Sequence, residues 1–152
     1  MEIIDHKYKI ENIKLGTGKF SEVFLGLNII SNQQIAIKKI SLLQEHLEID
    51  KLKFEIMIMQ KLDYLHVVGY YDVMMNDRYC YIIMEYCDAG TLNDVIQFNH
   101  ITTSKSISFN REANTYYYLK QLSDAINYLK LKDFIFVHFN ILPNILNNYK
   151  NI

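Results

Sequence analysis

Alternating apolar and polar positions predict extended strands in the first part of the chain. β-branched side chains such as Ile35 and Ile37 favour a strand even where the alternation is imperfect. Asn76 and Asp77 separate two apolar runs and are typical of a hairpin turn. The five strands expected from these signals cover residues 8–15, 22–28, 34–40, 67–75 and 79–85.

The apolar spacing becomes helical after the third expected strand. Between residues 45 and 62, four apolar side chains recur three or four positions apart, namely Ile49, Leu52, Ile56 and Met59. A short helix is expected at 91–98 with Thr91 as its cap, followed by a polar loop at 100–110. The longest helix should cover 111–130, with an apolar stripe of Tyr118, Leu122, Ala125, Ile126 and Leu129. One helix inserted into a small antiparallel sheet, with further helices behind it, is an α+β arrangement.

Composition and charge narrow the setting of the chain. The 152 residues suffice for one domain with a core, and the net charge of −1 gives no reason to expect nucleic acid or an anionic membrane as a partner. The charged, alternating start does not resemble a signal peptide, and no apolar run approaches the roughly 20 residues that span a bilayer. We interpret Cys80 and Cys87 as two small buried apolar residues in a reducing compartment, in preference to a metal site or a disulfide. We therefore expect an intracellular, cytoplasmic protein.

The turn between the first two strands contains two glycines in a suggestive pattern. Because a strand and not a helix follows it, the dinucleotide fingerprint and the Walker loop are excluded. The turn resembles the glycine-rich loop of protein kinases, G-x-G-x-x-G-x-V, with Ser21 in place of the third glycine. That resemblance implies a loop folded over the phosphates of ATP, whereas an ordinary hairpin turn is the alternative for this stretch alone. Its residues are Leu15, Gly16, Thr17, Gly18, Lys19, Phe20, Ser21, Glu22 and Val23.

Two charged residues further along the chain extend the resemblance. Residues 35–38 read Ile-Ala-Ile-Lys and are similar to the V-A-I-K strand of kinases, which implies that Lys38 pairs with the α and β phosphates. Glu55 on the expected helix would hold that lysine in place. The alternatives are a surface lysine beside Lys39 and a local pair between Glu55 and Lys51.

Residues 81–92 resemble the kinase hinge in sequence and in position. The resemblance implies that Met84 is the gatekeeper and that the backbones of Glu85 and Cys87 bind adenine. An unremarkable buried strand is the alternative. The roof and floor of the adenine site would be Val23, Ala36 and Leu146.

With four motifs in order, the resemblance to protein kinases covers residues 8–147. It implies a kinase-like small lobe at 1–86, which holds the ATP-binding loop and the hinge. A partial large lobe at 87–152 would end at the catalytic loop.

The stretch that matches the kinase catalytic loop, H-R-D-x-x-x-x-N, has lost its working residues. Asn140 follows His138 where the family has the aspartate that accepts the substrate proton, and a neutral amide is not basic near pH 7. Leu142 replaces a lysine that would steady the transferred phosphate, and Phe139 replaces an arginine. Asn144 is one position closer to His138 than the metal-binding asparagine of the family. No residue at this site is expected to be catalytically competent.

No D-F-G follows before residue 152, which makes Mg²⁺ binding doubtful, while ATP remains the expected ligand. We also expect a protein partner over the apolar face of the truncated large lobe. Three hypotheses follow: a regulatory or scaffold pseudokinase of Ser/Thr type, an active Ser/Thr kinase completed by another chain, or a non-functional gene relic.

Overall fold

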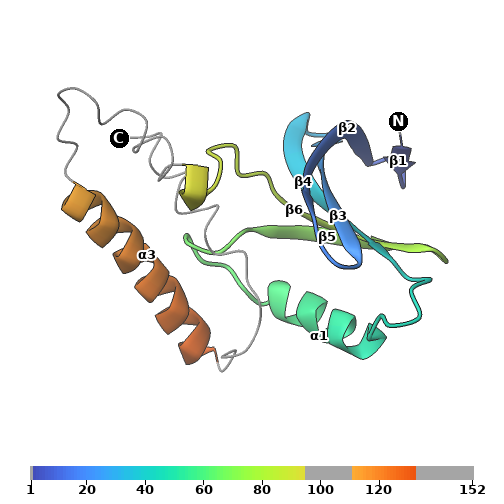
Figure 1. The fold of residues 1–152 in the computed structure, drawn as a ribbon. Coiled ribbons are helices and arrows are strands. Elements are labelled where there is room, and N and C mark those ends of the chain that lie inside the picture. The colour runs from blue at the N-terminus through green and yellow to red at the C-terminus, as the bar shows by residue number, and fades with distance from the viewer. Residues whose placement is uncertain (1, 95–110, 133–152) are drawn as a thin grey trace. The chain divides into compact units, whose positions relative to one another are not determined.

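The computed structural model describes residues 2–94 and 111–132 (Figure 1). By compactness the chain divides into two units, the first formed by Met1–Leu62 with Gly69–Tyr86 and the second by Asp63–Val68 with Cys87–Ile152. The elements in chain order are β1 (Glu2–Ile4), β2 (Tyr8–Thr17), β3 (Ser21–Asn28), β4 (Gln33–Ser41), α1 (Ile49–Met59), β5 (Tyr70–Met75), β6 (Tyr79–Glu85) and α3 (Arg111–Leu131).

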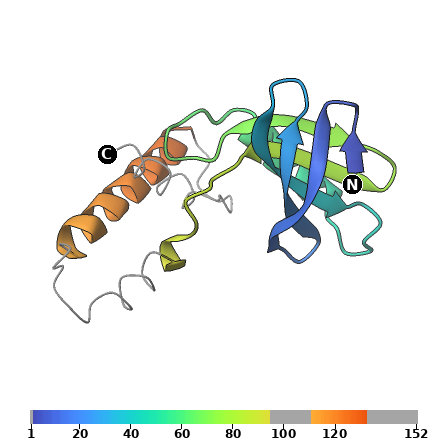
Figure 2. The same ribbon diagram turned by 90° about the horizontal axis from the view of Figure 1, so that it is seen from above.

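The first unit is a six-stranded sheet with the order β1-β2-β3-β4-β6-β5, in which every neighbouring pair is antiparallel. All five expected strands are present, and the α+β class is confirmed. The sixth strand, β1, was not expected. Figure 2 shows the sheet curling, so that its N-terminal strand lies near the far end of β5.

A tight turn connects β1 to β2. Lys7 N donates a hydrogen bond to Ile4 O at 3.0 Å, and the two residues between them, Asp5 and His6, have φ values of 47° and 53°. Positive φ at both central positions is the geometry of a type I′ turn, which suits the twist of an antiparallel hairpin. Aspartate tolerates this region better than most residues, so Asp5 is the local signal for the turn.

The core of the first unit lies on both faces of the sheet. On one face the buried side chains are Ile4, Tyr8, Ile10, Ile35, Ile37, Tyr81 and Ile83. On the other face, which α1 covers, they are Ile40, Leu52, Ile56, Cys80 and Ile82. Successive residues of β6 alternate between the two clusters, so the strand is apolar from residue 79 to residue 84 because both of its faces are covered.

Helix α1 is shorter than expected, because it begins at Ile49 and ends at Met59 instead of covering 45–62. Leu42 and Leu47 precede it in turns and pack against the helix-side cluster, so their apolar character reflects core packing outside the helix. Glu48 occupies the N-cap position without a side-chain hydrogen bond to the helix. Apolar spacing therefore locates the helix but not its first residue.

In the second unit, Thr91 caps the start of the short helix as expected. Asp94 N donates to Thr91 Oγ1 at 3.2 Å, and Thr91 N donates to Asp94 Oδ2 at 2.7 Å. This reciprocal pair is a capping box with an aspartate in place of the usual glutamate. Residues 92–94 are helical, and the rest of the expected 91–98 helix lies outside the described residues.

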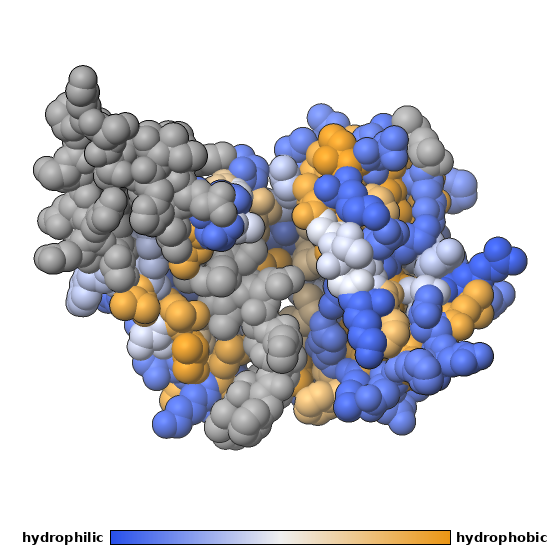
Figure 3. Space-filling view, viewed as in Figure 1, coloured by the Kyte–Doolittle hydropathy of each residue, from blue (hydrophilic) through white to orange (hydrophobic). Residues whose placement is uncertain are grey.

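Helix α3 buries most, but not all, of the expected stripe. Ala125 and Leu129 are buried, but Ile126 is 50% exposed and Gln121 is only 5% exposed. The ring of Tyr128 stacks on Tyr64 with centroids 4.5 Å apart, so aromatic contact adds to the aliphatic packing of this helix. Figure 3 shows hydrophobic residues at the surface of both units, among larger polar areas.

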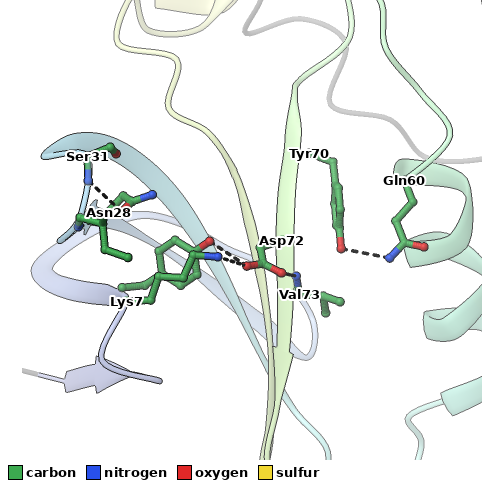
Figure 4. Close-up of polar contacts among 9 residues, drawn as sticks. Lys7, Asn28, Ser31, Gln60, Tyr70, Asp72 and Val73 are labelled. Carbon is green, nitrogen blue, oxygen red and sulfur yellow. Dashed lines mark hydrogen bonds and ion pairs between the residues drawn. The ribbon is translucent and has the colours of Figure 1, made fainter.

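The turn after β1 is fastened to the edge strand β5 by a small polar cluster (Figure 4). Lys7 Nζ and Tyr8 Oη donate to Asp72 Oδ2 at 2.7 and 2.8 Å, and Val73 N donates to Asp72 Oδ1 at 2.9 Å. Burial alone would raise the pKa of Asp72, but these donors outweigh it and hold the pKa below its ordinary 3.8. The hydrogen bond to Asp72 in turn raises the pKa of Lys7.

We expect the Asp72→Asn variant to lose part of the acid sensitivity of the fold. A carboxyl whose pKa is lowered by folding stabilises the protein above its unfolded pKa, and that contribution disappears as the pH falls through the folded pKa. The free energy of unfolding of the wild type should therefore fall more steeply below about pH 5 than that of the variant. Urea titrations from pH 7 downward measure both curves, and parallel curves would contradict the role of Asp72.

Candidate nucleotide-binding site

The glycine-rich stretch forms the tip of the hairpin between β2 and β3. Gly16 lies opposite Val23 in the register, Thr17 lies opposite Glu22, and Gly18 N donates to Ser21 O at 2.7 Å across the tip. A Cβ added at Gly16 would meet no atom of the described residues within 4 Å, so the backbone there is open to an approaching ligand. At Gly18 an added Cβ would lie 2.7 Å from Ser21 Oγ, which fills the space beside the loop.

The charged and aromatic side chains of this hairpin lie along its flanks. Lys14 pairs with Glu22 across the two strands, and Lys19 Nζ lies 4.8 Å from the centre of the Phe20 ring. Leu15 is 41% exposed, whereas Val23 is half-buried.

Lys38 and Glu55 meet between the sheet and α1. Lys38 lies two residues before Ile40 on β4, so strand alternation places both on the α1 face, and Glu55 precedes the buried Ile56 on α1. Lys38 Nζ is 2.9 Å from Glu55 Oε1, with the side chains 24% and 33% exposed. The local alternative is not formed, because Lys51 pairs with Glu48 at 2.7 Å.

The hinge-side residues lie on β6 and its neighbour β4. Met84 is 4% exposed and faces Ala36 in the register, so the expected gatekeeper and roof residues are adjacent. Glu85 N donates to Gly69 O at 2.8 Å, and the Glu85 carboxylate accepts from Gly69 N at 3.0 Å. Both contacts fix the end of β6 against the segment that leads into β5.

Some predicted site residues are not brought into this group. Cys87 is half-buried and belongs to the second unit, whereas the hairpin belongs to the first. The predicted floor residue and the residues of the altered catalytic loop lie outside the described residues, and they are His138, Asn140, Asn144 and Leu146.

Sequence reasoning missed a second polar cluster, on the sheet face opposite α1. The Glu2 carboxylate accepts from Lys39 Nζ and from Tyr81 Oη, each at 2.6 Å, and Lys39 Nζ also lies 4.2 Å from the centre of the Tyr79 ring. Burial, together with the hydrogen bond to Glu2, raises the pKa of Tyr81 to about 12. The members of this polar cluster lie on three strands that are far apart in sequence, so no local motif could have predicted the cluster.

Within residues 2–94 and 111–132, no three His, Cys, Asp or Glu side chains are grouped to hold a metal ion. Cys80 and Cys87 form no disulfide with any described residue, and burial raises the pKa of Cys80. In the same parts of the chain, every helix is too short or too polar to cross a membrane.

Comparison with known proteins agrees with this arrangement. The profile of the protein kinase domain matches residues 9–151. A candidate serine/threonine-protein kinase of Acanthamoeba polyphaga mimivirus is 48% identical over 152 residues, which cover 96% of this chain and 33% of the relative. Calcium-dependent protein kinase 5 of Plasmodium falciparum is 34% identical over 140 residues, covering 91% of this chain and 23% of that protein.

A third relative, the serine/threonine-protein kinase atg1 of Dictyostelium discoideum, is 29% identical over 137 residues. The chain covers 86% of its own length in that match and 19% of the relative, so it spans a third or less of each of these kinases. The profile match, which includes nearly the whole chain, together with the hairpin and the Lys38–Glu55 pair, shows that the chain belongs to the protein kinase family and is of the serine/threonine kinase type.

Proposed function

We propose that this chain binds ATP through the glycine-rich hairpin and Lys38, and that it serves as a regulatory or scaffold pseudokinase. The observation that carries the proposal is the 2.9 Å ion pair between Lys38 and Glu55. In kinases this lysine contacts the phosphates and the helix glutamate holds it in place. The Lys38–Glu55 pair therefore supports the proposal that the small lobe holds this lysine in the position that nucleotide binding requires.

The described residues fit the phosphates of ATP. A lysine ammonium has three N–H donors, and one of those of Lys38 is directed at Glu55 Oε1. The remaining donors, on a side chain that is 24% exposed, are available to phosphate oxygens. The open backbone at Gly16 allows the close approach that phosphate binding by N–H groups requires.

The sequence of the catalytic loop argues against phosphoryl transfer. Asn140 cannot accept the proton of a substrate hydroxyl as an aspartate would, and Leu142 brings no positive charge to the transferred phosphate. Asn144, displaced by one position, is a poor match to the metal-binding asparagine. Binding without transfer is the function that these substitutions leave.

A second candidate is the nucleotide-binding part of a larger, active Ser/Thr kinase. The observation in its favour is that the chain corresponds to only 33% of the mimivirus relative. Under this proposal, residues supplied from elsewhere would provide the catalytic base and the metal ligands.

Two measurements on the same preparation test the proposal. In a thermal-shift titration, ATP should raise the melting temperature of the purified chain, with about 2.7 kcal/mol of stabilisation at a hundred times its dissociation constant. The shift should persist without Mg²⁺. Incubation with radiolabelled ATP, Mg²⁺ and a general acceptor such as casein should give no incorporation.

Incorporation above background would overturn the pseudokinase proposal. If a co-expressed second chain were needed for it, the result would favour the second candidate. A cooperative melt without any response to ATP would exclude nucleotide binding, and the absence of a cooperative melt would indicate a gene relic.

A further inference from the structure

The two edge strands of the first unit border the same recess. Among the described strands, in the order β1-β2-β3-β4-β6-β5, β1 is paired only with β2, and β5 is paired only with β6. The sheet curls enough for the turn after β1 to reach β5, since Lys7 lies 2.7 Å from Asp72. Beyond that contact, residues of both edges line a cavity of about 420 Å³. This volume falls in the range of ligand pockets, roughly 300–1,000 Å³.

Ile3 presents its backbone groups to the outer side of β1. Ile29 N donates to Lys7 O at 2.9 Å, so the carbonyl of Lys7 points toward β3. Lys9 lies two residues further along β2, and its backbone groups therefore point toward β3 as well. Tyr8 and Ile10 then face β1, where their partners are Ile4 and Glu2. Because backbone groups of successive strand residues point to alternate sides, the N–H and C=O of Ile3 face away from β2.

Met75 is placed in the same way on β5. Asn76 N donates to Tyr79 O at 3.0 Å, so the backbone of Asn76 faces β6 at the hairpin turn. Met74, opposite Tyr81, faces β6 as well, and the N–H and C=O of Met75 between them point outward. Ile3 and Met75 are each 57% exposed, and both line the cavity.

The side chains that line the cavity also favour a ligand of positive charge. The lining residues are Glu2, Ile3, Ile4, Asp5, Met74, Met75, Asn76 and Tyr81, and none of them is cationic. Glu2 is already neutralised by Lys39, whereas Asp5 forms no ion pair with any residue in the described part of the chain. An exposed carboxylate beside two apolar side chains favours a ligand that alternates basic and apolar residues.

We propose that the gap between β1 and β5 receives an extended peptide segment of a partner protein. The segment would pair as an added strand with the outward groups of Ile3 or Met75, place apolar side chains against those two residues, and direct a basic residue to Asp5. Strand addition of this kind takes its affinity from main-chain hydrogen bonds and its selectivity from alternate side chains. The proposal does not depend on nucleotide binding, since the site uses none of the hairpin residues or Lys38.

Fluorescence polarisation with a labelled peptide, Arg-Val-Lys-Val-Arg, tests the proposal on the full chain. We expect saturable binding, and in hydrogen–deuterium exchange the amide of Ile3 or that of Met75, according to the strand that the peptide joins, should become more protected. The same peptide N-methylated at alternate amides keeps its side chains but cannot pair as a strand, so it should not bind. A Glu-Val-Glu-Val-Glu peptide should also fail, because its charge matches that of Asp5.

Matched variants locate the site. Met75→Lys should weaken the affinity for the peptide by about tenfold through like-charge repulsion. Leu43→Lys, at a 70% exposed position outside the cavity, should change that affinity by less than about twofold. Asp5→Asn, which suits the positive φ of Asp5, should weaken it less than Met75→Lys does.

Equal binding of the N-methylated peptide would overturn strand addition. Equal effects of Met75→Lys and Leu43→Lys would place the peptide elsewhere. A concentration-dependent dimer that excludes the peptide would show instead that the edges pair with a second copy of the chain.

Discussion

Replacing Lys38 with methionine should remove most of the response of the melting temperature to ATP. Methionine keeps the length of the side chain but leaves phosphate oxygens without a cation and leaves Glu55 without its partner 2.9 Å away. If the dissociation constant rises a hundredfold, the stabilisation at a fixed ATP concentration falls from about 2.7 to about 0.4 kcal/mol. Differential scanning fluorimetry at matched ATP concentrations measures this difference.

Lys39→Met is the matched control. Lys39 is the next residue on β4, but its side chain pairs with Glu2 at 2.6 Å on the face opposite α1. This variant should have a lower melting temperature without ATP yet retain the ATP-dependent rise. If both variants lost the rise equally, the ATP-dependent change in melting temperature would depend on the general stability of the fold, and a contact between ATP and Lys38 would be excluded.

Replacing Gly26 with alanine should cost about 2–3 kcal/mol of stability, the largest effect that we expect from a single methyl group. A Cβ at Gly26 would lie 2.4 Å from Ile37 Cδ1 and 2.9 Å from Lys9 O. Ile37 is fully buried, and the Lys9 carbonyl belongs to the neighbouring strand β2, so neither can move without disturbing the core. The free energy of unfolding in urea measures the cost.

Gly16→Ala provides the comparison, because in the part of the chain that the structure describes its added Cβ would meet nothing within 4 Å. Its stability should change by less than about 0.5 kcal/mol. If the two alanine variants were equally stable, the contact between Gly26 and Ile37 would not limit packing in this sheet.

Periodicity located every element of the first unit except β1, because the other elements have a clear local signal. Strand β6 was predicted with its exact bounds, since its apolar run begins just after the turn residues Asn76 and Asp77 and ends at Glu85. The start of α1 was misplaced because Leu47 is apolar for a reason that lies in the sheet and not in the helix. Ile126 was misassigned in the same way, because helical spacing alone cannot identify which apolar residues will be covered.

The Lys38–Glu55 pair was anticipated only through resemblance to kinases. Spacing alone allowed Glu55 to pair with Lys51, and the packing of α1 on the sheet decides between the two partners. The contacts of Asp72 with Lys7 and of Glu2 with Lys39 could not be predicted, because they depend on how far the sheet curls. Pairwise contacts between distant strands have no periodic signature in the chain.

The strand order also bears on how the chain folds. Strands β1 to β4 are neighbours both in sequence and in the sheet, so they can form as successive hairpins at little cost in loop-closure entropy. Strand β6 instead pairs with β4, from which it is separated in the sequence by α1 and β5. In this pairing Tyr79 lies opposite Ser41. Contacts of such large sequence separation form slowly. During synthesis, the meander and its glycine hairpin can therefore assemble early, whereas the cluster against which α1 packs is complete only after β6 has supplied Cys80 and Ile82.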